Sequence, residues 1–288
     1  MSDLSGAASL DGMPTVGVVL PCLNEARNLD YVFERMPDIV QEVVLVDGGS
    51  TDGTVERALQ LWPSVVVVYQ TRTGKGNALA CGFAKCTSDI VVMLDADGST
   101  DPAEIPAFVQ ALIDGAHFAK GSRFLSGGGS TDITRLRRLG NAGLSRLVNL
   151  LFKTNFTDLC YGYNACWRWV LPYMDLPDID ETPSKEGRMV WGDGFEVETL
   201  INIRMADSPL VVTEVPSREA ARLHGTSNLN AWSDGLRVLA TIMREYRRRV
   251  LNRRRQVPAL GQTPLSRSGF GARDGVTAPT SRGSIRDD

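Results

Sequence analysis

The sequence IVVMLDADGS, residues 90–99, is an apolar run of strand length that stops at two aspartates, Asp95 and Asp97. Its β-branched residues are typical of a buried parallel strand. In open α/β sheets, ligands bind outside the carboxyl ends of the strands. Two carboxylates this close together repel each other, and their oxygens are the ligands that hard divalent ions prefer. The stretch therefore predicts a site for Mg²⁺ or Mn²⁺ that carries a phosphorylated substrate.

The alternative interpretation of Asp95 and Asp97 is a solvated turn. An Asp-x-Asp pattern is short enough to arise by chance in a chain of this size. Asp178-Ile179-Asp180 has the same spacing, but it lies among prolines and no strand precedes it. The surrounding sequence therefore has to decide between a metal site and a turn.

Length and composition limit the class of protein. The chain has 288 residues, 43% of them hydrophobic and 23% charged, which fits one large or two small globular domains. Its net charge of -3 indicates that nucleic acid is not a partner. The five cysteines lack the spacing of zinc ligands, and we expect reduced thiols. Because no signal peptide precedes Met13 and no apolar run is long enough to span a bilayer, we expect a cytoplasmic protein that at most binds peripherally at the inner membrane face.

Strands and helices alternate through the first 115 residues. We expect strands at residues 16–20, 43–46, 65–69 and 90–94, the first broken by Pro21. A helix follows each strand: Asn24 caps the first, Gly74-Lys75-Gly76 opens the third, and Pro102 begins the fourth. This pattern predicts an α/β fold with a mostly parallel central sheet, flanked by helices, and a Rossmann-like first half.

Each predicted strand ends in a polar, acidic or glycine-rich turn. Since the carboxyl ends of parallel strands meet at one edge of a sheet, we expect these turns to converge. The chain has neither a six-residue dinucleotide fingerprint nor a Walker A loop, and Gly-x-Gly alone is weak evidence of a phosphate site. The presence of four such turns in order favours a ligand site at Asp95 and Asp97 over a solvated turn there. They are Asn24-Glu25, 47–52, 74–76 and 95–97.

In this order, the segments resemble the nucleotide-sugar domain of family 2 glycosyltransferases. The similarity extends over residues 15–240 and is strongest to the subgroup of dolichyl- or polyprenyl-phosphate mannosyl- and glucosyltransferases. It implies the GT-A fold. The matching segments are VLPCLNE at 19–25, DGGSTDGT at 47–54, GKG at 74–76 and DADGSTDP at 95–102.

The resemblance implies a role for each residue that matches on the donor side. A divalent ion stabilises the charge of a leaving diphosphate as a Lewis acid. For Asp47, the alternative to a role in base binding is simple capping of its turn. The implied roles are the base and ribose pocket for Pro21, Asn24 and Glu25, a hydrogen bond to the base for Asp47, the nucleotide or its phosphates for Lys75, the ribose or a metal-bound water for Asp95, and the metal itself for Asp97.

On the acceptor side, Arg123 matches an arginine that faces phosphate in the subgroup, and Arg222 and Ser227 match a loop that closes over the diphosphate. Asn164 and Asn228 stand where the subgroup has cations, which weakens the case for a lipid-phosphate acceptor.

A hydroxyl acceptor needs a carboxylate as general base, and Asp193 or Glu196 is the natural candidate. We expect both to lie at the start of a helix, where the alternative role of an acid such as Asp193 is that of a cap. If the acceptor is a phosphate anion, no base is required. Glu198 matches an acidic position of the family on the same helix.

Two later helices are strongly amphipathic and basic. Their arginines have the charge that binds anionic lipid, although a basic face exposed to solvent is the common alternative. We divide the chain into disordered residues 1–13, a glycosyltransferase domain at 14–250 and a disordered basic tail at 251–288. Within the domain, residues 14–123 form the nucleotide-sugar half and residues 124–250 the acceptor half. The residues expected to face inward are Leu139, Leu144, Leu147, Val148 and Leu151 in the helix 135–152, and Trp232, Leu236, Leu239, Ile242 and Met243 in the helix 231–249.

The sequence thus predicts a metal-dependent glycosyltransferase. It would transfer a sugar from a UDP- or GDP-sugar, with inversion, to polyprenyl phosphate or to a small molecule of a biosynthetic pathway. Peripheral membrane contact and a homodimer both remain open. The alternatives are a nucleotidyltransferase that makes a nucleotide-sugar, whose basic glycine-rich loop is missing near the amino terminus, and a nucleotide-sugar-binding protein without catalysis.

Overall fold

The computed structural model describes residues 12–182, 189–225 and 231–252. Its described strands form one seven-stranded sheet and one two-stranded ribbon. The strands of the large sheet are β1 (Val16–Cys22), β2 (Val40–Asp47), β3 (Val66–Tyr69), β4 (Ile90–Met93), β5 (Phe118–Ser122), β7 (Asn164–Trp167) and β8 (Val212–Pro216), and those of the ribbon are β6 (Gly129–Ser130) and β9 (Arg218–Glu219).

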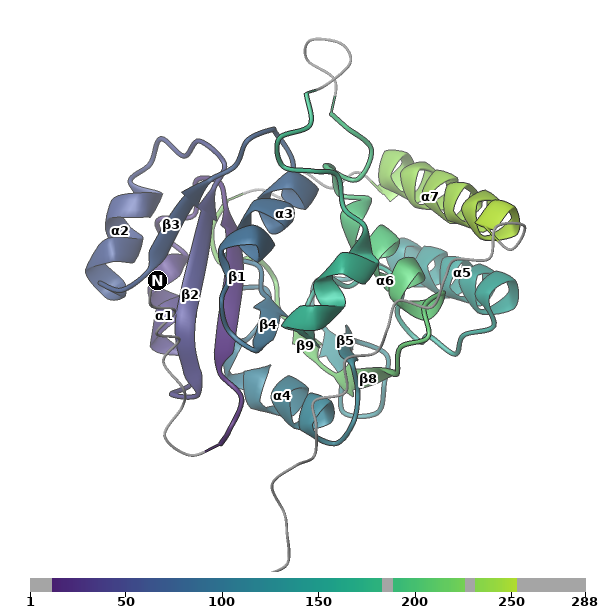
Figure 1. Ribbon diagram of the computed structural model, residues 1–288, viewed down its shortest axis with the longest axis horizontal. Coiled ribbons are helices and arrows are strands. Elements are labelled where there is room, and N and C mark those ends of the chain that lie inside the picture. Colours follow the sequence, from purple (N-terminus) through teal and green to yellow (C-terminus); the bar gives the residue numbers. More distant parts are fainter. Residues whose placement is uncertain (1–11, 183–188, 226–230, 253–288) are drawn as a thin grey trace, which may run out of the picture.

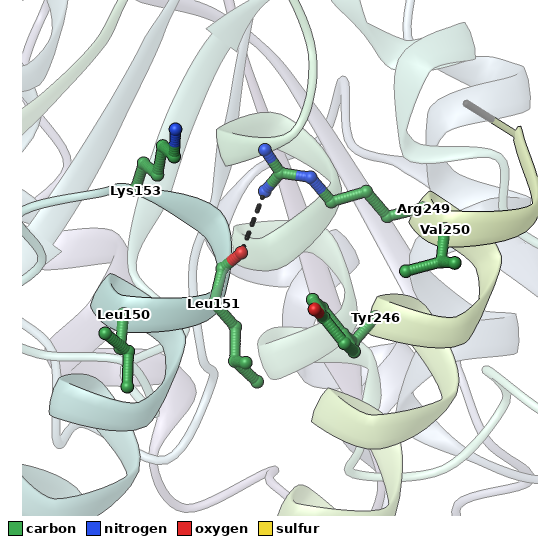
Figure 2. Close-up of a pocket in the computed structure, with 6 residues that line it drawn as sticks. All are labelled: Leu150, Leu151, Lys153, Tyr246, Arg249 and Val250. Atoms are coloured by element: carbon green, nitrogen blue, oxygen red, sulfur yellow. Dashed lines mark hydrogen bonds between the residues drawn. The ribbon is translucent and has the colours of Figure 1, made fainter.

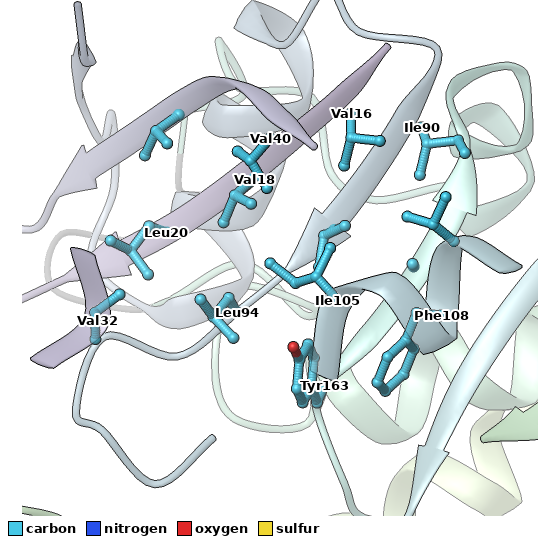
Figure 3. Close-up of a cluster of buried hydrophobic side chains, with 14 of the residues drawn as sticks. Val16, Val18, Leu20, Val32, Val40, Ile90, Leu94, Ile105, Phe108 and Tyr163 are labelled. Atoms are coloured by element: carbon cyan, nitrogen blue, oxygen red, sulfur yellow. The ribbon is translucent and has the colours of Figure 1, made fainter. Parts of the chain in front are cut away.

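Helices cover both faces of the large sheet (Figure 1). Helices α1, α2 and α4 pack with Val18 and Leu20 of β1 on one face, and α3 and α6 pack with Val19 and Val46 on the other. Figure 3 shows part of the first cluster. The helices are α1 (Leu29–Glu34), α2 (Thr54–Leu61), α3 (Lys75–Lys85), α4 (Ile105–Ile113), α5 (Arg135–Phe152), α6 (Val197–Ala206) and α7 (Ala231–Asn252), with 3-10 turns η1 (Pro102–Glu104) and η2 (Arg168–Met174).

The strand order β3-β2-β1-β4-β7-β5-β8 confirms the predicted mostly parallel sheet. Strands β2 and β4 both run parallel to β1, on opposite sides of it. The chain therefore changes direction across the sheet between β1 and β4, and such a switch point is where α/β folds bind ligands. Strand β7 is the exception, because it runs antiparallel to both β4 and β5.

Because β7 is antiparallel, its first residue lies where its neighbours end. Asn164 pairs with Met93, the last residue of β4, and with Lys120 of β5. The segment that enters β7 thus reaches the same edge of the sheet as the turns that leave β1, β2 and β4.

Two predictions about the first turn were wrong. The first strand continues through Pro21 to Cys22, because Pro21 lies beyond Val19, the last residue of β1 that pairs with β4, and its missing N–H costs no ladder bond on that side. Asn24 does not cap α1, which begins at Leu29 after Asn28. Instead, Asn24 adopts a left-handed backbone with φ 57°, and its side-chain oxygen accepts a hydrogen bond from Thr51 N at 2.9 Å.

Helix α5 has the predicted bounds, but its predicted inward residue Leu139 is 72% exposed. On α7, Leu236, Leu239 and Met243 were also predicted to face inward and are exposed. The buried face of α7 includes Thr241, Ile242 and Glu245, and Glu245 accepts hydrogen bonds from Arg204 of α6 at 3.1 Å. The side of α7 that carries Glu245 therefore faces α6, and the apolar side chains on the opposite side are exposed. The side chain of Trp232 lies outside the described residues.

No helix in the described part of the chain combines the length and the apolar content that a membrane crossing requires. All five cysteines are free thiols. Residues 1–11 and 253–288, which include most of the predicted terminal segments, lie outside the described residues.

Candidate active site

The turns after β1 and β2 are joined by hydrogen bonds at the carboxyl edge of the sheet. Asn24 N donates to Ser50 Oγ, and Glu25 N donates to Thr54 Oγ1, each at 2.9 Å. Ala26 N donates to the Asp52 carboxylate. The two turns therefore form one unit that fixes where the Glu25 side chain begins.

Lys75, at the start of α3, lies between two carboxylates. Its Nζ is 2.6 Å from Asp95 Oδ1 and 2.5 Å from Glu198 Oε1 of α6. Burial alone would lower the pKa of Lys75, but the two carboxylates outweigh it and raise that pKa. Burial and the nearby Asp95 raise the pKa of Glu198. Lys75 thus couples α3, the end of β4 and the start of α6.

Arg222 reaches the same edge from the segment after β9. Its guanidinium lies 3.2 Å from Asp97 Oδ2 and donates to Glu25 Oε1 at 2.9 Å, while Leu223 N donates to Asp97 O. Burial raises the pKa of Glu25, against the lowering effect of hydrogen bonds from Asn28 and Arg222. The structure therefore gives each of the predicted metal ligands, Asp95 and Asp97, a cationic neighbour.

A cavity of about 260 Å³ opens beside Asp47, between the ends of β2 and β3. The buried Asp47 carboxylate accepts hydrogen bonds from Gly49 N and Ser50 N, so it does cap its own turn. Its role in base binding stays a prediction. The cavity is lined by Asp47, Gly48, Gly49, Tyr69, Gln70, Thr71, Arg72 and Thr73.

Asp193 is completely buried and forms a two-pronged ion pair with Arg72. Arg72 Nε and Nη2 donate to its two oxygens at 2.7 and 2.9 Å, and Arg72 Nη1 donates to main-chain carbonyls, among them that of Ile179. The predicted helix start was wrong: α6 begins at Val197, four residues after Asp193, because residues 190–196 form a loop that closes on Arg72 and Gly76.

Glu196 is buried in the same loop. Its Oε1 accepts hydrogen bonds from Gly192 N at 3.0 Å and from Gly194 N at 3.3 Å. Both candidate bases, Asp193 and Glu196, are thus held by protein groups, and their catalytic role stays a prediction.

Arg123, at the end of β5, is also buried and paired. It donates through Nε and Nη2 to Asp158 and through Nη1 to Glu219. Burial alone would raise the pKa of Asp158, but the hydrogen bonds and charge of Arg123 lower it. The phosphate-facing role of Arg123 stays a prediction, since the guanidinium meets a phosphate only if Glu219 releases it.

Three further positions were singled out from the sequence, Asn164, Ser227 and Asn228. Asn164, where the subgroup has arginine, is buried and donates to Gly162 O, while its side-chain oxygen has no hydrogen-bond partner among the described residues. Ser227 and Asn228 lie outside the described residues.

Sequence reasoning missed Arg72, Asp158 and Glu219 as partners of the candidate site. Arg72 stands just before the Gly74-Lys75-Gly76 turn, but its partner Asp193 is 121 residues away. Asp158 and Glu219 are likewise 35 and 96 residues from Arg123, so no local pattern in the sequence pairs them with it.

Comparison with known proteins identifies the family. The sequence profile described as Glycosyl transferase family 2 matches residues 17–171, more than half of the chain. The chain belongs to glycosyl transferase family 2. The observed sheet and the order of its edge turns agree with this assignment.

Two curated relatives of this family 2 chain act on lipid phosphates by their names. The dolichol-phosphate mannosyltransferase of Pyrococcus furiosus is 28% identical over 223 residues, and the match covers 74% of this chain and 59% of that protein. The undecaprenyl-phosphate mannosyltransferase of Micrococcus luteus is 30% identical over 222 residues, covering 74% of this chain and 86% of that protein. The chain thus spans less than two thirds of the first relative and most of the second.

A solved structure of similar fold is the glucosyl-3-phosphoglycerate synthase of Mycobacterium tuberculosis, in complex with Mn²⁺, UDP-glucose and phosphoglyceric acid. The TM-score is 0.61 and the identity 25%, over 81% of this chain and 80% of that one. The same synthase has also been solved with Mg²⁺ and UDP.

Close packing of Gly76 against the loop of Asp193 gives a first testable prediction. Gly76 N donates to Asp193 O at 2.7 Å, and a Cβ at Gly76 would lie 1.7 Å from Gly192 O. Gly76→Ala should therefore push this loop away and lower the free energy of unfolding by about 1–3 kcal/mol, measured by urea denaturation.

The matched control is Gly140→Ala in α5, where the added Cβ would meet nothing within 4 Å. Alanine is the better helix former, so this variant should gain about 0.5–1 kcal/mol. If both variants were equally stable, the contact between Gly76 and Gly192 would not matter to the fold.

Proposed function

We propose that this family 2 protein transfers a sugar, with inversion, from a UDP- or GDP-sugar to a phosphate-bearing acceptor in a metal-dependent reaction. One observation carries the proposal: at the switch point of the sheet, Asp95 and Asp97 each face a cation, Lys75 and Arg222. A site in which carboxylates and cationic side chains lie next to one another suits a diphosphate and its metal. The carboxylates can bind the metal ion, and the cations can bind the phosphate oxygens. The cavity beside Asp47 is the proposed place of the base.

The residues present fit a divalent ion. The described residues hold no group of three or more His, Cys, Asp or Glu side chains arranged to bind a metal. Mg²⁺, however, is usually bound by one or two carboxylates together with substrate phosphates and water. Asp97 and Asp95 would supply the protein oxygens. When bound, the ion stabilises the negative charge of the leaving diphosphate.

The chain's own cations serve the same purpose. Lys75 and Arg222 lie beside the carboxylates, and a diphosphate placed there accepts hydrogen bonds from both. Arg222 also holds Glu25, so the turn after β1 and the segment after β9 are already joined where the diphosphate would lie.

The surroundings of the two candidate bases favour an acceptor that is already anionic. Asp193 is bound on both oxygens by Arg72, and Glu196 accepts two backbone hydrogen bonds. Asp193 therefore has to break a contact with Arg72 before it can act as a base, and the other oxygen of Glu196, Oε2, lies 4.0 Å from Arg237 Nε. A phosphate acceptor needs no base. The names of the relatives support polyprenyl phosphate, reached at the cytoplasmic face of the membrane. A small phosphorylated molecule is the second candidate, supported by the synthase structure with phosphoglyceric acid.

Calorimetry with UDP-glucose, UDP-N-acetylglucosamine and GDP-mannose tests the donor. We expect one of them to bind at least about tenfold more tightly with Mn²⁺ than without, because the ion neutralises the diphosphate beside two carboxylates. Transfer to polyprenyl phosphate or to 3-phosphoglycerate is then followed with a radiolabelled sugar. Metal-dependent binding with no transfer to either acceptor would favour a binding protein, and binding of none of the three donors contradicts the enzyme.

A further inference from the structure

Arg72 lies in the segment that enters α3, between the cavity beside Asp47 and the loop 190–196. It forms part of the wall of that cavity, which is the proposed place of the base. Its guanidinium forms the ion pair with Asp193, 121 residues along the chain. The side chain of Arg72 is 7% exposed and that of Asp193 is 0% exposed. One buried arginine therefore joins the proposed base site to a loop of the predicted acceptor half.

Every nitrogen of the Arg72 guanidinium already has an acceptor in the protein. Nε and Nη2 donate to the carboxylate of Asp193. The planar fork of arginine suits such a set of acceptors, and a lysine ammonium cannot reproduce it. A nucleotide would have to displace these acceptors before it could bind the guanidinium. The acceptors of Nη1 are the main-chain oxygens of Asp178 at 2.7 Å, Ile179 at 3.0 Å and Glu181 at 2.9 Å.

The neighbours of Arg72 strengthen the same contact. Thr71 Oγ1 donates to Ile179 O at 2.6 Å, and Arg72 N donates to Asn77 Oδ1 at 2.8 Å. Asn77 is completely buried in α3, and its side-chain nitrogen donates to Thr71 Oγ1 at 3.1 Å. The wall of the cavity, the start of α3 and residues 178–181 thus form one hydrogen-bonded unit.

Lys75, three residues after Arg72, holds the chain just beyond the loop 190–196. Its Nζ is 2.5 Å from Glu198, in the first turn of α6, and 2.6 Å from Asp95. The segment that enters α3 therefore contacts the loop at Asp193 and the helix that follows the loop at Glu198. A shift of this segment would move the loop and the surroundings of Asp95 together.

We propose that Arg72 is a positioning residue that couples the base cavity to the loop 190–196. A base in the cavity fixes the segment 69–73, and through Arg72 it fixes the loop against which the acceptor binds. A ligand that orders a segment lowers the cost of ordering that segment for a second ligand. In this arrangement Asp193 anchors Arg72 and does not take a proton. The inference rests on the proposed function, since it takes the cavity as the site of the nucleotide base.

Hydrogen exchange of the full chain with UDP or GDP and Mn²⁺ tests the coupling without sugar transfer. Amides of Gly192 and Gly194 are hydrogen-bonded to Glu196, so their exchange reports the opening of the loop. In the parent chain, bound nucleotide should slow the exchange of residues 190–196 at least about fivefold. Arg72→Met should abolish this slowing, while its affinity for the nucleotide in calorimetry stays within about threefold of the parent value.

Arg72→Met leaves a buried carboxylate without its partner, so a second variant guards against local unfolding. Arg72→Met with Asp193→Asn removes both charges, and it should also lose the slowing by nucleotide while it still binds UDP or GDP. Circular dichroism should show both variants folded.

Transfer kinetics distinguishes positioning from direct binding of the donor. With polyprenyl phosphate or 3-phosphoglycerate as acceptor, Arg72→Lys should raise the KM of the acceptor about tenfold and leave the KM of the donor within about threefold. Arg72→Met and Asp193→Asn should not add, and the double variant should be no slower than the slower single variant, because the two residues act as one pair. An equal rise in both KM values overturns the positioning role, and additive losses overturn the anchor role of Asp193.

The matched control is Arg249→Met, because Arg249 is another largely buried arginine that binds a carboxylate and a main-chain oxygen. Its Nε lies 3.2 Å from Asp207 Oδ1, and its Nη1 donates to Leu151 O at 3.2 Å. It lines a second cavity, of about 220 Å³, where α5 and α7 end (Figure 2). Arg249→Met should leave the slowing of residues 190–196 by nucleotide unchanged.

Two outcomes separate this inference from the proposed function. If nucleotide binds the parent chain without slowing the loop, or slows it equally in Arg72→Met, the coupling is overturned and the proposed function stands. If neither UDP nor GDP binds the parent chain, the proposed function is overturned together with the coupling.

Discussion

Replacing Asp97 by alanine should reduce sugar transfer by at least about 100-fold, because the proposed ligand of the divalent ion is lost and a bound metal contributes several kcal/mol to the stability of the transition state. The fold should survive. The Asp97 carboxylate is partly exposed, and within its own turn it accepts a hydrogen bond from Ser99 N. The measurement is the initial rate over a Mn²⁺ titration, together with Mn²⁺ binding by electron paramagnetic resonance, which reports the site without turnover.

The chain supplies its own control for Asp97. Asp180 is the second acid of Asp178-Ile179-Asp180, which has the same spacing, and it is exposed. Asp180→Ala should keep the parent rate and the parent affinity for Mn²⁺. If Asp97→Ala kept both within threefold, the metal site at the end of β4 would be wrong.

Replacing Asp158 by asparagine should lower the free energy of unfolding by about 3–5 kcal/mol, because it leaves a buried guanidinium without its main partner. Arg123 is 5% exposed and uses two of its nitrogens on Asp158. In the variant, Glu219 is the remaining carboxylate bonded to the arginine. Urea denaturation followed by circular dichroism measures the difference.

The ion pair between Arg123 and Asp158 also makes the free energy of unfolding depend on pH. Arg123 lowers the pKa of Asp158 in the folded chain, while in the unfolded chain this pKa is about 3.9. The contribution is therefore complete above the unfolded pKa and is lost as the pH falls through the folded one. We expect the parent chain to lose stability below about pH 4 more steeply than Asp158→Asn.

The control for this pair is Asp132→Asn, which removes the partner of Arg137 from a half-exposed ion pair. Such pairs contribute little, so the unfolding midpoint should hardly move. Equal midpoints for the Asp158 and Asp132 variants would mean that burial of the Arg123 pair has no energetic consequence.

The first half of the fold was predictable because its pattern is local. Short apolar strands, each followed by a turn and an amphipathic helix, specify parallel strands with little reference to the rest of the chain. The second half was not. Strand β7 enters between β4 and β5, and its four residues carry no period that tells an antiparallel neighbour from a parallel one.

The same difference between local patterns and long-range contacts applies to the candidate site. Asp95, Lys75 and Glu25 come together because each follows or precedes an element whose end the sheet fixes. Arg72 and Asp193 do not share an element, so only tertiary structure brings them together. The rotation of α7 was missed for a similar reason: the side that is buried carries Ile242 together with the polar Glu245, whose partner Arg204 lies 41 residues away.

The antiparallel strand β7 has a consequence for how such a protein can change during evolution. Because Asn164 starts its strand where β4 and β5 end, the segment 153–163 enters the sheet at the edge that holds the candidate site, whereas the turns after β1, β2 and β4 leave the sheet there. Lys153 and Asn155 of this segment are exposed and lie outside every strand pairing, so they can change without shifting the register of β1, β2 or β4. We therefore expect related chains to differ in acceptor mainly at such exposed positions, while the buried Asp158, Leu159 and Tyr163 stay unchanged.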